Sequence, residues 1–188
     1  MTRLQQALGA LALAASSAAG AQSFDGATLN YQYYFPNSST PYPAADNGSF
    51  VVGPGIEVDN VSDDRATLDI SGSNIFIDFI SNSVWTTETF NGWILSDQSD
   101  SLAAILGVSI DPASNLAGFS LSNISFTENQ IAVNWQGLSF TDSTVLSLNV
   151  TFGNNAVPEP GTWAMMLLGF GVAGIALRRG RKPKLATA

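Results

Sequence analysis

The chain has 188 residues, a formal net charge of −8, and neither histidine nor cysteine. It therefore cannot hold a Ser-His-Asp triad, a cysteine nucleophile or the usual zinc site. Six of the seven basic residues lie before residue 4 or after residue 177, whereas 14 of the 15 acids lie between residues 22 and 157. This acidic middle segment contains no lysine for Schiff-base chemistry, and its charge repels phosphates, which excludes nucleic acid as a partner.

The first 21 residues have the pattern of a secretory signal peptide. Arg3 supplies the positive start, residues 7–15 are apolar, and residues 19–21 read Ala-Gly-Ala, an A-x-A cleavage site. We expect cleavage between Ala21 and Gln22, so that the mature chain is exported.

Residues 22–152 predict a single all-β domain, an antiparallel β-sandwich or jelly-roll. Apolar and polar residues alternate with period two, most clearly over residues 146–152, which is typical of half-buried strands. Residues 75–80 are apolar on both faces and predict a central strand. Further strands are expected at residues 28–35, 49–52, 56–59, 66–70, 84–90, 92–95, 119–121, 124–127 and 131–135.

Other local patterns predict the connections between these strands. Asn91-Gly92 is typical of a tight hairpin turn. Residues 99–106 predict a short helix with Ser99 as its N-cap. Residues 36–48 predict a long loop, and residues 153–157 a linker to the C-terminal segment.

A dense group of acids offers a candidate metal site. Carboxylates are hard oxygen ligands that suit Ca²⁺, although the spacing matches no known calcium loop. The alternative is a solvated acidic loop in which Arg65 pairs with Asp63 or Asp69. The candidate ligands all lie between residues 57 and 69: Glu57, Asp59, Asp63, Asp64 and Asp69.

Aromatic residues offer a second candidate site, because exposed rings stack on sugars. Trp93 follows the predicted turn and is the candidate for sugar stacking. Trp135 alternates in phase with Ile131 and Val133, which favours a place in the core. Tyr31 and Tyr33 are expected on one face of their strand, with Tyr34 on the other.

The C-terminal segment combines a short motif, an apolar stretch and a basic run. Residues 163–177 contain no charge, and with residues 161–162 they predict a membrane helix over about 161–177. The basic run is expected to hold residues 183–188 in the cytoplasm, which leaves the acidic domain outside. The motif residues are Pro158, Glu159, Pro160, Trp163 and Ala164, and the basic residues are Arg178, Arg179, Arg181 and Lys182.

This segment, residues 158–182, resembles the PEP-CTERM sorting signal of Gram-negative bacteria, in the variant with Trp-Ala after the motif. The resemblance implies that an exosortase, a membrane-embedded transpeptidase, reads the tail while it is held in the inner membrane. It implies cleavage near the motif and release of the acidic domain to the cell surface or extracellular matrix, in association with exopolysaccharide.

Three hypotheses follow for the acidic domain. The first is a non-enzymatic structural or adhesive component of the matrix, which needs no cofactor. The second is a carbohydrate-binding module, with calcium as the candidate cofactor and a polysaccharide as the partner. The third is a glycoside hydrolase that uses two carboxylates, for which fourteen acids offer many pairs but no specific pattern.

Overall fold

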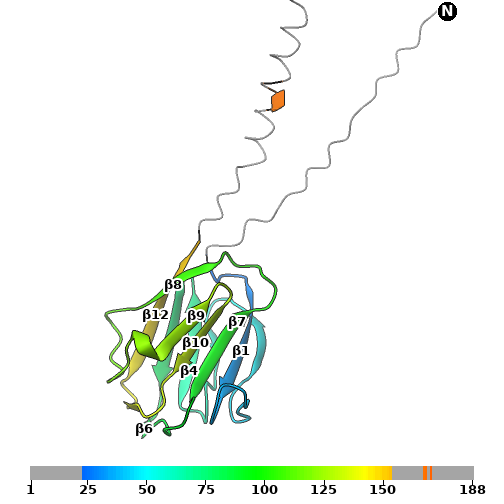
Figure 1. Cartoon of the computed structure of the whole chain (residues 1–188). Coiled ribbons are helices and arrows are strands. Elements are labelled where there is room, and N and C mark those ends of the chain that lie inside the picture. Colours follow the sequence, from blue (N-terminus) through cyan, green and yellow to red (C-terminus); the bar gives the residue numbers. More distant parts are fainter. Residues whose placement is uncertain (1–22, 154–166, 169, 171–188) are drawn as a thin grey trace, which may run out of the picture. The chain divides into compact units, whose positions relative to one another are not determined.

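The structure is a computed structural model that describes residues 23–153, 167–168 and 170 (Figure 1). The chain divides into two compact units, and the one that spans residues 20–155 contains every strand of the described residues. In the other unit, Leu167, Leu168 and Phe170 are helical and exposed. Among the described residues, no helix is long and apolar enough to cross a membrane. The predicted signal peptide, sorting motif, basic run and most of the predicted membrane helix lie outside the described residues.

The first of two five-stranded sheets is antiparallel throughout. Its central strands place Tyr33, Trp93 and Val133 opposite one another, so that all three side chains lie on one face, and all three are buried. The residues that alternate with them, such as Gln32, Ile94 and Ala132, lie on the other face. In spatial order the strands are β2 (Gly48–Val51), β1 (Thr28–Tyr34), β7 (Gly92–Asp97), β10 (Gln130–Asn134) and β9 (Ile124–Thr127).

The second five-stranded sheet is also antiparallel, and β5 lies at its centre as predicted. Ile75, Ile77 and Phe79 of β5 are fully buried, whereas Phe76 on the opposite face is 38% exposed. One face of this sheet is therefore apolar and inward. In spatial order the strands are β3 (Ile56–Val58), β4 (Ala66–Ser71), β5 (Asn74–Phe79), β12 (Val145–Phe152) and β8 (Ile105–Ile110), while β6 (Ser83–Val84) and β11 (Ser139–Phe140) form a separate pair.

The buried faces of the two large sheets contribute to one hydrophobic cluster. The Tyr31 hydroxyl of β1 donates a hydrogen bond to the carbonyl of Val61, just before β4, at 2.8 Å. Phe79 of β5 lies 5.7 Å from Trp135, which follows β10. Burial of apolar area, at roughly 25 cal/mol per Å², is the main force that stabilises such a cysteine-free domain. The prediction of an all-β, antiparallel domain is confirmed.

The predicted helix over residues 99–106 is wrong. The carboxylate of Asp97 accepts hydrogen bonds from the backbone N–H groups of Ser99, at 3.1 Å, and Leu102, at 2.8 Å. Asp100 has a φ of 50°, outside the helical region. A side chain that captures these amides offers the backbone an alternative to a helix, and the segment then continues into β8.

The predicted hairpin turn at Asn91-Gly92 is also wrong. Asn91 is buried and Gly92 begins β7, where its Cα lies against β10. A β-carbon at Gly92 would overlap the carbonyl oxygen of Val133, so the glycine serves a close approach of two strands rather than a turn. The preceding strand is short: of the predicted residues 84–90, only Val84 belongs to a strand, β6.

The alternation at residues 119–121 does not produce a strand. Leu121–Asn123 form a 3₁₀ helix, η1, and Leu121 is 60% exposed. The side chain of Asn123 accepts a hydrogen bond from the backbone N–H of Ser120 at 2.9 Å, which closes this turn locally. Three alternating residues are too few to outweigh such a side-chain cap.

Candidate functional site

The acids predicted to bind calcium are not brought together. The described residues contain no group of three or more His, Cys, Asp or Glu side chains placed to hold one metal ion. Asp59 and Asp64 are exposed in the connection between β3 and β4, whereas Asp69 lies within β4, opposite Ile56. The prediction of a calcium site at these residues is therefore corrected. The acids are close in the sequence, but the strands and the turn between them hold the carboxylates apart.

Glu57 instead stabilises the edge of the second sheet. Its two carboxylate oxygens accept hydrogen bonds from the backbone N–H groups of Gly53, at 3.0 Å, and Ile70, at 2.7 Å. The register between β3 and β4 is irregular from Ile56 to Val58, so the usual strand pairing is interrupted there. The side chain thus satisfies two amides next to a bulge.

Replacing Glu57 by alanine is expected to lower the free energy of unfolding by about 1–3 kcal/mol, because two amides lose their acceptor. Urea denaturation followed by circular dichroism measures the change, with Glu88→Ala as a matched control at an exposed acid. Adding calcium chloride should leave the midpoint of both variants and of the parent chain unchanged. A midpoint of the parent chain that rises with calcium, and falls again with a chelator, would contradict this role.

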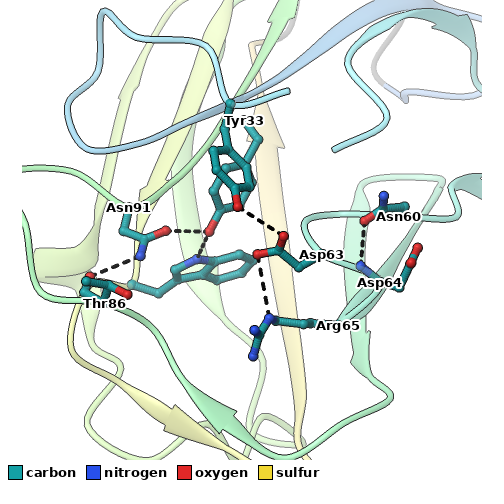
Figure 2. A network of polar contacts seen from close by, with 9 residues as sticks. Tyr33, Asn60, Asp63, Asp64, Arg65, Thr86 and Asn91 are labelled. Carbon is teal, nitrogen blue, oxygen red and sulfur yellow. Dashed lines mark hydrogen bonds and ion pairs between the residues drawn. The ribbon is translucent and has the colours of Figure 1, made fainter. Parts of the chain in front are cut away.

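The turn between β3 and β4 holds an ion pair. Asp63 and Asp64 both have left-handed backbone, with φ values of 52° and 53°. The Asp63 carboxylate accepts a hydrogen bond from the Tyr42 hydroxyl at 3.0 Å and lies 3.7 Å from the Arg65 Nε (Figure 2). The backbone N–H of Asp64 donates to Asn60 Oδ1 at 2.9 Å. Of the two partners predicted for Arg65, the structure selects Asp63.

Trp93 does not stack on a sugar from the surface. It is fully buried, because its place in β7 pairs it with Tyr33 on one side and Val133 on the other. Its ring lies 6.3 Å from that of Tyr31 and 6.5 Å from that of Trp135. The sugar-stacking prediction for Trp93 is therefore wrong, and the residue belongs to the core.

A buried polar network joins three segments at one end of this core. The Tyr33 hydroxyl donates to Asn91 Oδ1 at 2.7 Å and accepts from Trp135 Nε1 at 2.8 Å (Figure 2). The Asn91 amide donates to the carbonyl of Thr86 at 3.0 Å. Burial raises the pKa of Tyr33, although the hydrogen bond from Trp135 opposes the shift. At neutral pH the phenol therefore stays protonated and can hold both contacts.

The aromatic residues around this network form a compact stack. The rings of Trp85 and Trp135 are parallel to within 8° and 4.9 Å apart, and Phe140 lies 4.9 Å from Trp85. Both tryptophans are buried, so the prediction that Trp135 lies in the core is confirmed. Sequence patterns did not indicate the network itself, because Tyr33 and Trp135 are 102 residues apart.

The residues that carry the sorting prediction lie at the other end of the chain, beyond the described strands. A family model described as the PEP-CTERM protein-sorting motif matches residues 156–182. The chain carries a PEP-CTERM sorting motif. The match includes Pro158, Glu159 and Pro160 as well as the apolar stretch and the basic run to Lys182.

This PEP-CTERM motif implies export and processing by exosortase in a Gram-negative bacterium. It covers only the C-terminal segment and is separate from the β-domain of residues 23–153. Comparisons with curated proteins and with solved structures found no match for the chain.

Proposed function

We propose that this protein is an exosortase substrate whose acidic β-domain is released to the cell surface or extracellular matrix, where it acts as a structural or adhesive component of an exopolysaccharide layer. The PEP-CTERM motif at residues 156–182 carries the proposal. In the same proposal, residues 1–21 direct export, and residues of about 161–177 hold the chain in the inner membrane until cleavage. Pro158 and Pro160 favour an extended backbone that a processing enzyme can bind.

The β-domain suits a structural role rather than catalysis. We infer that its two large sheets form a β-sandwich, because their buried faces share one cluster and aromatic contacts cross between them. The whole chain lacks His and Cys, and the β-domain lacks Lys, which removes histidine bases, cysteine nucleophiles and lysine Schiff-base chemistry. Fourteen acids against Arg65 alone give a surface that keeps released copies soluble and mutually repelling at low salt.

Replacing both Pro158 and Pro160 by alanine should abolish release, because the motif then loses its fixed backbone. The full-length variant is expressed in a host that contains the exosortase, and cells are separated into membrane, surface and medium fractions. Nearly all of the parent chain is expected in the surface and medium fractions, and nearly all of the variant in the membrane fraction. The exposed Pro43 offers a matched control, and Pro43→Ala should be released normally.

Loss of the exosortase should reproduce the effect of the double variant with the parent sequence. Release of the double variant at the parent level would contradict sorting by this motif. Equal release from cells without the exosortase would contradict the proposed enzyme.

A further inference from the structure

A small cavity opens beside the polar network, where four segments of the β-domain meet. Its volume is about 80 Å³. These segments contribute three kinds of group: aromatic rings from the end of β1 and from the following loop, an ion pair from the turn before β4, and apolar residues from β6 and just after it. The residues that decide its chemistry are Phe35, Tyr42, Asp63, Arg65, Val84 and Trp85.

Arg65 is the single basic residue between residues 23 and 153, and it lies at this cavity. A guanidinium carries five N–H donors. The guanidinium of Arg65 makes no hydrogen bond with the described part of the chain. Its contact with Asp63 is a 3.7 Å ion pair through Nε, and both side chains are about one-third exposed. Donor and acceptor groups therefore lie side by side at the mouth, where a ligand can reach both.

The walls of the cavity are aromatic. Tyr42 is half-buried, with its ring 5.9 Å from Phe35 and its hydroxyl on Asp63. Burial raises the pKa of Tyr42, and the hydrogen bond to Asp63 adds to the shift, so the phenol is neutral at physiological pH. Trp85 lines the cavity, and its buried Nε1 has no hydrogen-bond partner within the described residues.

We propose that this cavity binds a single residue of a neutral sugar, with an apolar sugar face against Tyr42 and Phe35 and neighbouring hydroxyls on Asp63 and Arg65. A sugar hydroxyl both donates and accepts, which matches a carboxylate beside a guanidinium. Apolar walls with a few placed polar groups are the usual composition of small-ligand sites.

The charge of the site and the size of the cavity restrict further which sugars can bind. Asp63 compensates the charge of Arg65, and the rest of the domain is acidic, so an anionic sugar gains little at the site and is repelled by the surface. One water needs about 10–15 Å³. The cavity therefore has room for several waters or for one edge of a sugar ring, but not for several linked sugar residues. The site therefore recognises a terminal or branching residue. This inference goes beyond the proposed sorting and does not depend on it.

The test uses the full-length chain, labelled with ¹⁵N, in micelles of a phosphocholine detergent that contains no sugar. The four tryptophans give four indole N–H signals, which single Trp→Phe variants assign. Glucose, galactose, mannose and N-acetylglucosamine are titrated separately, with glucuronate as the anionic comparison. At least one neutral sugar should shift the Trp85 signal saturably at millimolar concentration and leave those of Trp93 and Trp163 in place.

Two substitutions and one matched control locate the effect. Tyr42→Ala and Arg65→Gln should each weaken binding by about tenfold or more. Tyr34→Ala also removes a tyrosine side chain, but Tyr34 lies on the face of β1 opposite to Tyr33 and does not line the cavity. This variant should bind as the parent chain does. An unchanged Trp93 signal shows that each variant is folded. The proposal is overturned if no neutral sugar shifts Trp85, if glucuronate binds more tightly, or if both cavity variants bind normally.

Discussion

Replacing Trp135 by alanine should lower the free energy of unfolding by about 3–5 kcal/mol, the largest effect that we expect from one substitution in the β-domain. The indole is fully buried, stacks on Trp85 at 4.9 Å and lies 5.7 Å from Phe79. Its removal leaves a cavity and also removes the indole N–H that donates to the Tyr33 hydroxyl. Since small domains are stable by only about 5–15 kcal/mol, the variant should unfold at a much lower urea concentration.

Trp135→Phe separates the packing from the hydrogen bond. The phenyl ring retains much of the stack, but the Tyr33 hydroxyl loses its donor, so the expected loss is about 1–2 kcal/mol. Thr127→Ala, at an exposed position of β9, is the control and should change stability little. A loss below about 1 kcal/mol for Trp135→Ala would contradict the central place of this ring in the core.

Replacing Asp97 by alanine is expected to lower the free energy of unfolding by about 3 kcal/mol. Only 4% of this side chain is exposed, and its carboxylate accepts from the backbone N–H groups of Ser99 and Leu102 and from the Ser99 hydroxyl. The substitution leaves these donors without an acceptor and frees the connection from β7 to β8. Asp142→Ala, at an exposed carboxylate, is the matched control and should leave the urea midpoint nearly unchanged.

The contribution of Asp97 should disappear in acid. Burial acts to raise the pKa of its carboxyl, but the hydrogen bonds from Leu102 and Ser99 hold the pKa below its ordinary value. Because the folded-state pKa is lowered, the stabilisation is fully present above the unfolded pKa of about 3.9 and is lost as the pH falls through the folded pKa. The difference between the parent chain and Asp97→Asn should therefore be large at neutral pH and shrink below about pH 4. A difference that grows in acid would contradict this role.

Local patterns predicted the strands well where alternation ran for five residues or more. In β10 and β12 the apolar residues do face the core, and the doubly apolar β5 does lie at the centre of its sheet. The same reasoning failed where a side chain competes for the backbone. Asp97 binds backbone N–H groups of the segment predicted to be a helix, and Asn123 binds that of Ser120 in the segment predicted to be a strand. These contacts exist only in the folded chain, so the sequence pattern could not show them.

The site predictions divide along the same line. The sorting motif was predictable because all of its information is contiguous, and the family model matches it at residues 156–182. The turn pattern at Asn91-Gly92 predicts a surface position for Trp93, whereas the pairing of three strands buries it. The cavity at Tyr42 and Arg65 could not be foreseen, because its walls come from segments that only the sheets bring together.

We propose that the chain is exported, cleaved at its PEP-CTERM motif and released. Intact mass spectrometry of the protein recovered from the surface of its native host tests it most directly. The recovered chain should begin at Gln22 and end within residues 158–160. A chain that still ends at Ala188 and is recovered only with the membrane fraction would contradict it.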